Sequence, residues 1–247
     1  MSEFESMIVS DAHLGAAPKA SEAAFHEFLT FAGGATRDLV INGDLFDFWF
    51  EYRTVVLRRH FRTLKALSEL VDAGVRIRLV GGNHDSWGGT FLTDEIGIEL
   101  IDGPIITEIG GQITYLAHGD GLGDGDLGYR MLKRVIRSGP ASYAFRRLHP
   151  DWADYVVRFV SHTETRQGIP DSGRSRATQL EALARATLAA DPSIQLVALG
   201  HCHIPSLIEV YPGRHYLNTG DWIDHCTWAT VGPDGVELHS WHVHDRN

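Results

Sequence analysis

Five short apolar runs in this chain end in aspartate, asparagine or histidine, residue types that bind metal ions or transfer protons. The runs lie at residues 7–10, 39–42, 75–80, 113–117 and 194–199. The polar residues that follow them include Asp11, His13, Asp44, Asn83, His84, Asp85, His118, His201 and His203. In an open α/β sheet, ligands bind beyond the carboxyl ends of the strands. Five strands that each deliver such a side chain there predict one shared site.

The candidate ligands favour a particular kind of metal centre. Aspartate, asparagine and histidine supply oxygen and nitrogen donors, which suit Mn²⁺, iron or Zn²⁺. Seven candidate ligands exceed the needs of one ion: Asp11, His13, Asp44, Asn83, His118, His201 and His203. A carboxylate shared by two ions about 3.5–4 Å apart would use all seven, as in phosphoryl-transfer enzymes. Each motif alone is more often a structural turn, but all five in this order favour a two-metal site.

The elements that must position these residues alternate between strand-like and helix-like runs. Apolar residues recur at helical spacing over 21–31 and 54–71, and apolar and charged residues alternate over 75–80 as in a strand. Further strands are expected at 105–109, 113–117, 194–199, 207–211, 216–218, 227–231 and 236–241, the last two forming a hairpin. This order predicts an α/β fold with a mostly helical insertion at 127–190.

Composition restricts the class of protein. The 247 residues are 43% hydrophobic and 22% charged, which is typical of a globular domain, and we expect a single domain over 1–247. The net charge of -10 argues against a nucleic-acid partner. Two cysteines do not make a disulfide framework and favour a reducing, cytoplasmic location. Residues 1–6 lack the apolar core of a signal peptide, and no apolar run approaches the ~20 residues that span a bilayer.

Taken together, the five motifs resemble those of the calcineurin-like metallophosphoesterases. That family carries D-x-H, G-D-x-x-D, G-N-H-D or G-N-H-E, a lone H, and G-H-x-H in this order, and all five occur here between residues 11 and 203. The resemblance implies a four-layer α/β/β/α sandwich with a two-metal centre at one rim. It implies a first ion on Asp11, His13, Asp44 and His203, and a second on Asn83, His118, His201 and the bridging Asp44.

The resemblance also implies a mechanism. Two cations lower the pKa of a bridging water and so provide a hydroxide nucleophile near neutral pH. They also stabilise the charge that builds on the phosphate in the transition state. His84 matches the histidine that contacts the phosphate and can protonate the leaving oxygen in the family, and Asp85 is expected to orient it.

A narrower resemblance points to a substrate. The runs 43–49 and 118–129 are similar to those of the UDP-2,3-diacylglucosamine pyrophosphatases, peripheral membrane enzymes of lipid A biosynthesis that release UMP and 2,3-diacylglucosamine 1-phosphate. The resemblance implies Mn²⁺ in preference to Fe²⁺ or Zn²⁺, and a helical lid at about 122–190 within the single domain. It also implies substrate contacts from Asp126, Tyr129, Arg174 and Arg176.

The expected lid carries a basic amphipathic segment. Residues 127–150 contain six basic residues and no acidic one, and apolar residues at helical spacing follow over 152–160. Such a segment suits an anionic membrane surface or an acylated, phosphorylated ligand. Together with this pattern, the resemblance implies peripheral contact with the cytoplasmic face of the inner membrane. The alternative is a helix that packs on its own core with a solvated basic face.

Three functions remain open from the sequence. The first is hydrolysis of UDP-2,3-diacylglucosamine, and the second is the same chemistry on another nucleotide pyrophosphate or a phosphodiester. The second gains support because many of these pyrophosphatases carry arginine where this chain has His84. The third is a non-catalytic scaffold, which would have no need of the full ligand set or of a general acid.

Three segments have open or secondary readings. The aromatic run 46–52 either lines a hydrophobic groove or forms a corner of the core. Cys202, between two candidate ligands, is expected to be a buried thiol that strand alternation points away from them. The run 218–222 is expected to be a turn that closes the sheet, with a place beside the site as the alternative.

Overall fold

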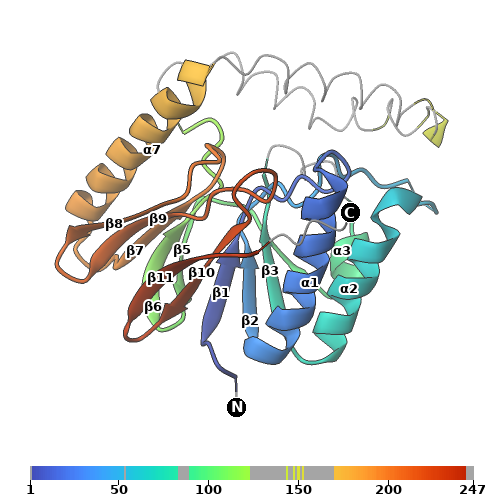
Figure 1. The fold of residues 1–247 in the computed structure, drawn as a ribbon, viewed down its shortest axis with the longest axis horizontal. Coiled ribbons are helices and arrows are strands. Elements are labelled where there is room, and N and C mark those ends of the chain that lie inside the picture. The colour runs from blue at the N-terminus through green and yellow to red at the C-terminus, as the bar shows by residue number, and fades with distance from the viewer. Residues whose placement is uncertain are drawn as a thin grey trace.

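Two β-sheets form the centre of the molecule, and helices cover their outer faces (Figure 1). The computed structural model describes residues 2–52, 54–82, 89–122, 143, 147, 149–150, 152 and 170–242. The first sheet has the order β11 (Gly235–Ser240), β10 (Thr227–Gly232), β1 (Ser6–Val9), β2 (Asp38–Ile41), β3 (Arg76–Val80) and β4 (Glu99–Ile101). The second has the order β5 (Ile105–Ile109), β6 (Gln112–Leu116), β7 (Leu196–Leu199), β9 (Arg214–Asn218) and β8 (Ser206–Tyr211).

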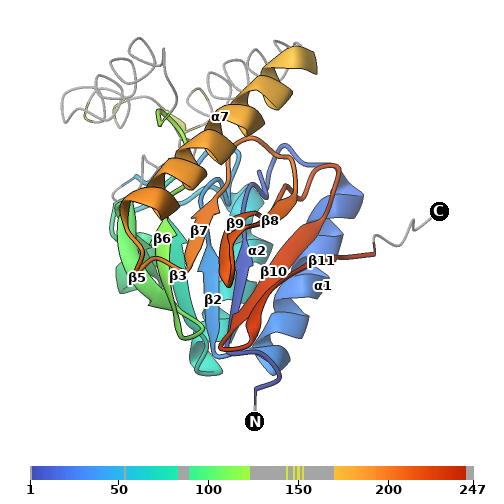
Figure 2. The ribbon, with the colours of Figure 1, turned by 90° about the vertical axis from the view of Figure 1, so that its left-hand side faces the viewer.

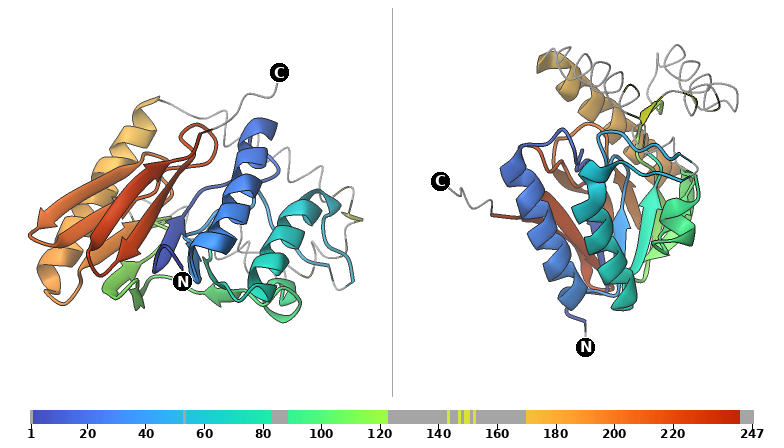
Figure 3. Two further views of the ribbon diagram at one scale, coloured as in Figure 1. Left: turned by 60° about the horizontal axis from the view of Figure 1, so that its bottom comes forward. Right: turned by 90° about the vertical axis from the view of Figure 1, so that its right-hand side faces the viewer.

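The helices lie on opposite sides of this pair of sheets. Helices α1 (Lys19–Ala35) and α2 (Phe61–Asp72) lie side by side on the outer face of the first sheet (Figure 3). Helix α7 (Pro170–Ala190) crosses the outer face of the second sheet (Figure 2). Two short elements also occur, η1 (Arg58–His60) and α3 (Phe91–Asp94).

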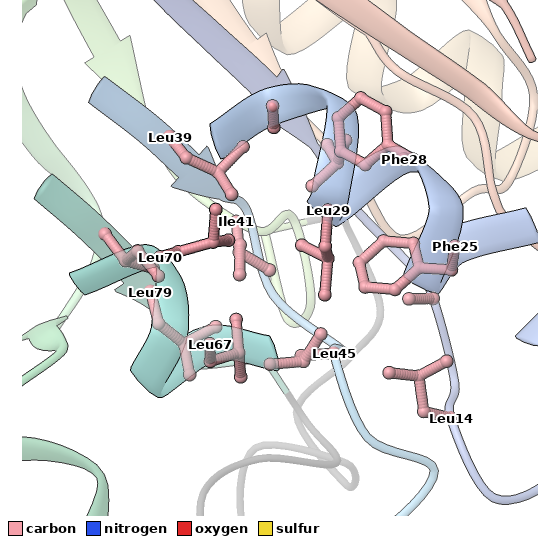
Figure 4. Packing of buried hydrophobic residues seen from close by; sticks show 14 of the residues in the cluster. Leu14, Phe25, Phe28, Leu29, Leu39, Ile41, Leu45, Leu67, Leu70 and Leu79 are labelled. Atoms are coloured by element: carbon pink, nitrogen blue, oxygen red, sulfur yellow. The ribbon is translucent and has the colours of Figure 1, made fainter. Parts of the chain in front are cut away.

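Three hydrophobic layers hold the elements together. The first, between α1, α2 and the first sheet, includes Phe28, Leu67 and Ile41 (Figure 4). The second lies between the two sheets and includes Val40 and Leu196. The third joins α7 to the second sheet. Ile41 faces the helices and Val40 faces the other sheet because successive strand residues point to opposite faces, and both faces are buried. Three apolar layers between four layers of structure confirm the expected α/β/β/α sandwich.

The strands that precede the candidate ligands are positioned by parallel pairing. Strand β1 pairs with β2 and β2 with β3 in parallel, as do β6 with β7 and β7 with β9. Parallel strands bring their carboxyl ends to one edge of a sheet. The loops that follow β1, β2, β6 and β7 therefore meet at one rim of the sandwich.

Several boundaries differ from the sequence-based expectation. The helix predicted over 54–71 begins later, with η1 and then α2, while Leu57 is extended. The β-branched residues Thr54, Val55 and Val56 favour helix weakly, which accounts for the later start. Helix α3 and strand β4 were not expected from the sequence, because their four and three residues are too short to show a periodicity.

The expected helical insertion is described only in part. Helix α7 confirms helical structure over 170–190, and Leu180, Ala184 and Leu188 pack against the second sheet. The C-terminal half of α7, which carries these three residues, is thus the outer layer of the sandwich. Most of the remaining insertion, including the basic segment of 127–142, lies outside the described residues, so the lid stays a prediction. None of the described helices has the length and apolar character needed to cross a membrane.

Candidate metal centre

Two groups of donor side chains lie at the rim where β1, β2, β6 and β7 end. The first group is Asp11, His13 and His203, and the second is Asp44, His118 and His201; within each group the donor atoms lie within 4.8 Å of one another. The groups adjoin, since His118 Nε2 lies 3.1 Å from Asp44 Oδ2 and 4.0 Å from Asp11 Oδ1. His13 Nε2 lies 3.9 Å from Asp44 Oδ2, so Asp44 faces both groups.

The backbone of these donors is unusual. Five of the six have positive φ: Asp11 (53°), His13 (44°), Asp44 (51°), His201 (68°) and His203 (61°). A left-handed conformation costs an L-residue roughly 1–2 kcal/mol, and such strain persists only where the surroundings hold it. Backbone hydrogen bonds hold it here, because Asp11 N donates to Gly43 O at 3.0 Å and His13 N donates to Asp44 O at 2.9 Å. The chain turns sharply after each strand and aims these side chains at the rim.

Two glycines make room for the donors. A Cβ on Gly43, whose φ is +86°, would lie 2.3 Å from His118 Nδ1. A Cβ on Gly82 would lie 2.2 Å from Asp44 Oδ1. Gly43 is therefore required both for its left-handed backbone and for the close approach of the imidazole, while Gly82 is required for space alone.

The electrostatics of the centre favour positive charge. Asp11 is fully buried, and burial raises the pKa of its carboxyl. Burial by itself would lower the pKa of His118, but the charges of Asp44 and Asp11 raise it to about 9. Burial also opposes the charged form of His203, yet the hydrogen bond that its ring donates to Asp221 and the charge of Asp11 raise its pKa to about 9. Buried carboxylates that draw protons onto neighbouring imidazoles will also draw cations.

His201 differs from the other two imidazoles. Burial, together with the positive charge of His118, holds the pKa of His201 well below its usual range. Its ring is therefore neutral at physiological pH, and a neutral imidazole is the form that binds metal ions. The charge of Arg176, on α7, acts in the same direction on His201. Arg176 thus lies close enough to influence the centre, although its side chain is exposed.

Other residues orient the donors without being donors themselves. His118 Nδ1 donates to the backbone oxygen of Asn42 at 2.8 Å, which leaves Nε2 to face Asp44. His203 Nδ1 lies 3.1 Å from Asp221 Oδ2. The run 218–222 was expected to be a turn, with a place beside the site as the alternative; it leads into a turn at 222–225 and also lies beside the site. The sequence feature that indicates this position is a polar, glycine-containing run directly after a strand. That strand is β9, which pairs in parallel with β7.

The remaining sequence-predicted site residues fall into two sets. Five lie outside the described residues: Asn83, His84, Asp85, Asp126 and Tyr129. Two lie on the first turns of α7 and are exposed: Arg174 and Arg176. The described structure therefore brings together six of the seven predicted metal ligands and places one predicted substrate-binding arginine near them.

Two questions about neighbouring segments are answered. Cys202 is buried as expected, and burial raises the pKa of its thiol to about 11, so it does not offer a thiolate. The expected reason was wrong, because the chain bends at 201–202 and both histidines have left-handed backbone, so this segment is not a strand. The aromatic run forms a corner of the core, since Phe46 and Trp49 are fully buried and stack on each other at 4.7 Å between centroids.

Comparisons with known proteins define the class of protein. The family model described as calcineurin-like phosphoesterase matches residues 6–205, which include both donor groups. The chain belongs to this family.

Relatives within the family share one name. A UDP-2,3-diacylglucosamine hydrolase of Porphyromonas gingivalis is 30% identical over 247 residues, covering 93% of this chain and 94% of that protein. A protein of the same name from Ralstonia nicotianae is 30% identical and covers 88% of this chain and 84% of its own. Another, from Pseudomonas putida, is 28% identical and covers 94% of this chain and 97% of its own.

Proposed function

We propose that this chain is a metal-dependent phosphoesterase that hydrolyses the pyrophosphate bond of UDP-2,3-diacylglucosamine to UMP and 2,3-diacylglucosamine 1-phosphate. The observation that carries the proposal is the pair of adjoining donor groups at the rim, with Asp44 facing both. Membership of the phosphoesterase family supports the reaction class. The relatives named as UDP-2,3-diacylglucosamine hydrolases, which match most of the chain, support the substrate.

The donor set fits two divalent cations. Each group combines one carboxylate with two imidazoles, and Asn83 would complete the second group. Nitrogen and oxygen donors suit Mn²⁺, Fe²⁺ and Zn²⁺, and we favour Mn²⁺ from the resemblance to the pyrophosphatases. When bound, two such cations would activate water for attack and offset negative charge on the phosphate.

The other residues take roles around this centre. His84 would donate a proton to the leaving oxygen, and Asp85 would orient its ring. Asp126, Tyr129, Arg174 and Arg176 would contact the nucleotide sugar. The position of Arg176 supports this assignment, because its charge already acts on His201. The basic insertion would bring the enzyme to the cytoplasmic face of the inner membrane, where an acylated substrate resides.

A second candidate shares the chemistry and differs in substrate. His84 stands where many UDP-2,3-diacylglucosamine pyrophosphatases have arginine, and this favours hydrolysis of another nucleotide pyrophosphate or of a phosphodiester. Both candidates require the same metal centre, so the substrate assay separates them.

The test is Mn²⁺-dependent release of UMP from UDP-2,3-diacylglucosamine, with bis-p-nitrophenyl phosphate assayed in parallel. We expect UMP release well above the chromogenic rate. Asp44→Asn should lower both activities about 100-fold or more and lose metal, because metal assistance is worth several kcal/mol. His84→Ala should lower UMP release by about 10²–10⁴ while the protein keeps its metal.

The matched control is Asp234→Asn, which removes the same charge from an exposed turn between β10 and β11. It should leave both activities unchanged. Activity on the chromogenic diester alone would contradict the proposed substrate and favour the second candidate. Wild-type turnover by Asp44→Asn would contradict the two-metal centre itself.

A further inference from the structure

Asp221 is a buried carboxylate that lies behind the first donor group. Its side chain is 2% exposed, and it follows β9 in the loop that leads to β10. Oδ1 accepts hydrogen bonds from three backbone N–H groups, those of Ile223 at 3.2 Å, Asp224 at 2.9 Å and His225 at 3.0 Å. Oδ2 faces His203 Nδ1 at 3.1 Å. Oδ1 thus contacts the loop 223–225, where His225 Nδ1 also lies 3.2 Å from it, while Oδ2 faces the imidazole of His203.

The contact with His203 determines which ring nitrogen is free. A carboxylate only accepts hydrogen bonds, so Nδ1 of His203 must carry the proton in this pair. In the neutral ring the lone pair then lies on Nε2, which is 3.4 Å from Asp11 Oδ1 and 3.2 Å from His13 Nε2. A carboxylate that accepts a hydrogen bond from the non-coordinating ring nitrogen fixes the tautomer and orientation of a metal-binding histidine.

The loop that carries Asp221 is attached to the centre at two more points. Trp222 N donates to Asp11 O at 3.1 Å, and Ser10 Oγ lies 2.8 Å from Thr219 Oγ1. Asp221 lies beyond residue 205, where the match to the family model ends. The family motifs therefore do not include it, and only the fold brings it to the site.

We propose that Asp221 is a positioning residue that holds His203 in the tautomer and orientation needed for metal binding, an inference that rests on the metal centre of the proposed function. Asp221→Asn tests this directly. The three backbone N–H groups require an oxygen at the Oδ1 position, so the new amide nitrogen faces His203 Nδ1. A donor at that position forces the imidazole to carry its proton on Nε2, where it blocks the metal.

The experiment is calorimetric titration of Mn²⁺ into metal-free protein, together with the melting temperature of the metal-free form. For Asp221→Asn we expect a 10–100-fold loss of affinity at one of two sites and a melting temperature close to wild type. Asp221→Ala should lose Mn²⁺ affinity and also have a lower melting temperature, because three backbone N–H groups lose their acceptor. Asp224→Asn is the matched control, because it removes the same charge from an exposed position in the same loop. This variant should change neither the Mn²⁺ affinity nor the melting temperature.

Three results would overturn the proposal: wild-type Mn²⁺ affinity in Asp221→Asn, an equal loss in Asp224→Asn, or failure of Asp221→Asn to fold. The last would show that the carboxylate is needed mainly for the loop. Because the readout is metal binding, the test does not depend on the substrate. Two-site Mn²⁺ binding by wild type without UMP release would contradict the proposed substrate alone.

Discussion

At the scale of single residues, the centre depends on backbone conformations that its donors rarely adopt. The types and order of the donors could be read from the sequence, because aspartate and histidine after apolar runs are visible there. The positive φ of Asp11 and His203 could not, since Asp and His adopt left-handed backbone more often than most residues but still only in a small minority of positions. Asp221 also could not be assigned a role, because its distance from His203 is set by the folded sheet. Sequence therefore predicts which donors are present, and the fold supplies how they are aimed.

Gly43→Ala tests the requirement for close approach at this scale. Gly74→Ala is its matched control, because both glycines have φ of +86° but a Cβ on Gly74 meets nothing within 4 Å. We expect Gly74→Ala to lose about 1–2 kcal/mol of unfolding free energy from backbone strain alone, with unchanged Mn²⁺ affinity. Gly43→Ala should lose more and also bind Mn²⁺ weakly, because the imidazole of His118 must move. Denaturant unfolding and metal titration measure both effects, and equal behaviour of the two variants would contradict the argument.

At the scale of elements, strand β3 shows what periodicity can and cannot reveal. Alternation of apolar residues with Arg76 and Arg78 predicts the strand, and the structure confirms it. The same pattern suggests that both arginines face solvent, yet Arg78 is 2% exposed. Its guanidinium pairs with Asp38 of β2, and its Nη1 donates to Glu108 O of β5 at 3.0 Å. The second sheet covers this face, and packing between distant segments leaves no local trace in the sequence.

The two arginines of β3 give a prediction about stability without a change in the metal centre. Arg78→Met breaks a buried ion pair and should cost about 3–5 kcal/mol of unfolding free energy, because Asp38 is left largely buried without its partner. Arg76→Met removes an exposed pair with Glu99 and should cost at most about 1 kcal/mol. Mn²⁺ affinity of the folded protein should be unchanged in both. Similar losses in the two variants, measured by urea unfolding, would show that burial does not distinguish these pairs.

At the scale of the whole molecule, the sandwich brings loops from both sheets to one rim. The order of strands and helices predicted an α/β fold, and the resemblance supplied its four layers. Which loops would share a donor group could not be derived from spacing alone. The first group joins Asp11 of one sheet to His203 of the other, 192 positions apart in the chain. Binding of a metal here therefore connects the two sheets and should stabilise the entire fold.

This coupling predicts that pH affects the stability of the metal-free protein and the stabilisation by Mn²⁺ in opposite directions. In the metal-free protein, His118 and His203 have a pKa of about 9, above the value of 6.5 in an unfolded chain. Their protonation therefore stabilises the fold fully below pH 6.5, and this contribution is lost as the pH rises through about 9. A bound cation must displace these protons, so metal affinity rises over the same interval. Between pH 6.5 and about 8.5 the melting temperature of EDTA-treated protein should fall, while the increase caused by saturating Mn²⁺ should grow. His201 and His60, whose pKa values burial lowers, affect stability only below this interval. A gain from Mn²⁺ that does not change with pH would contradict protonation of the two histidines.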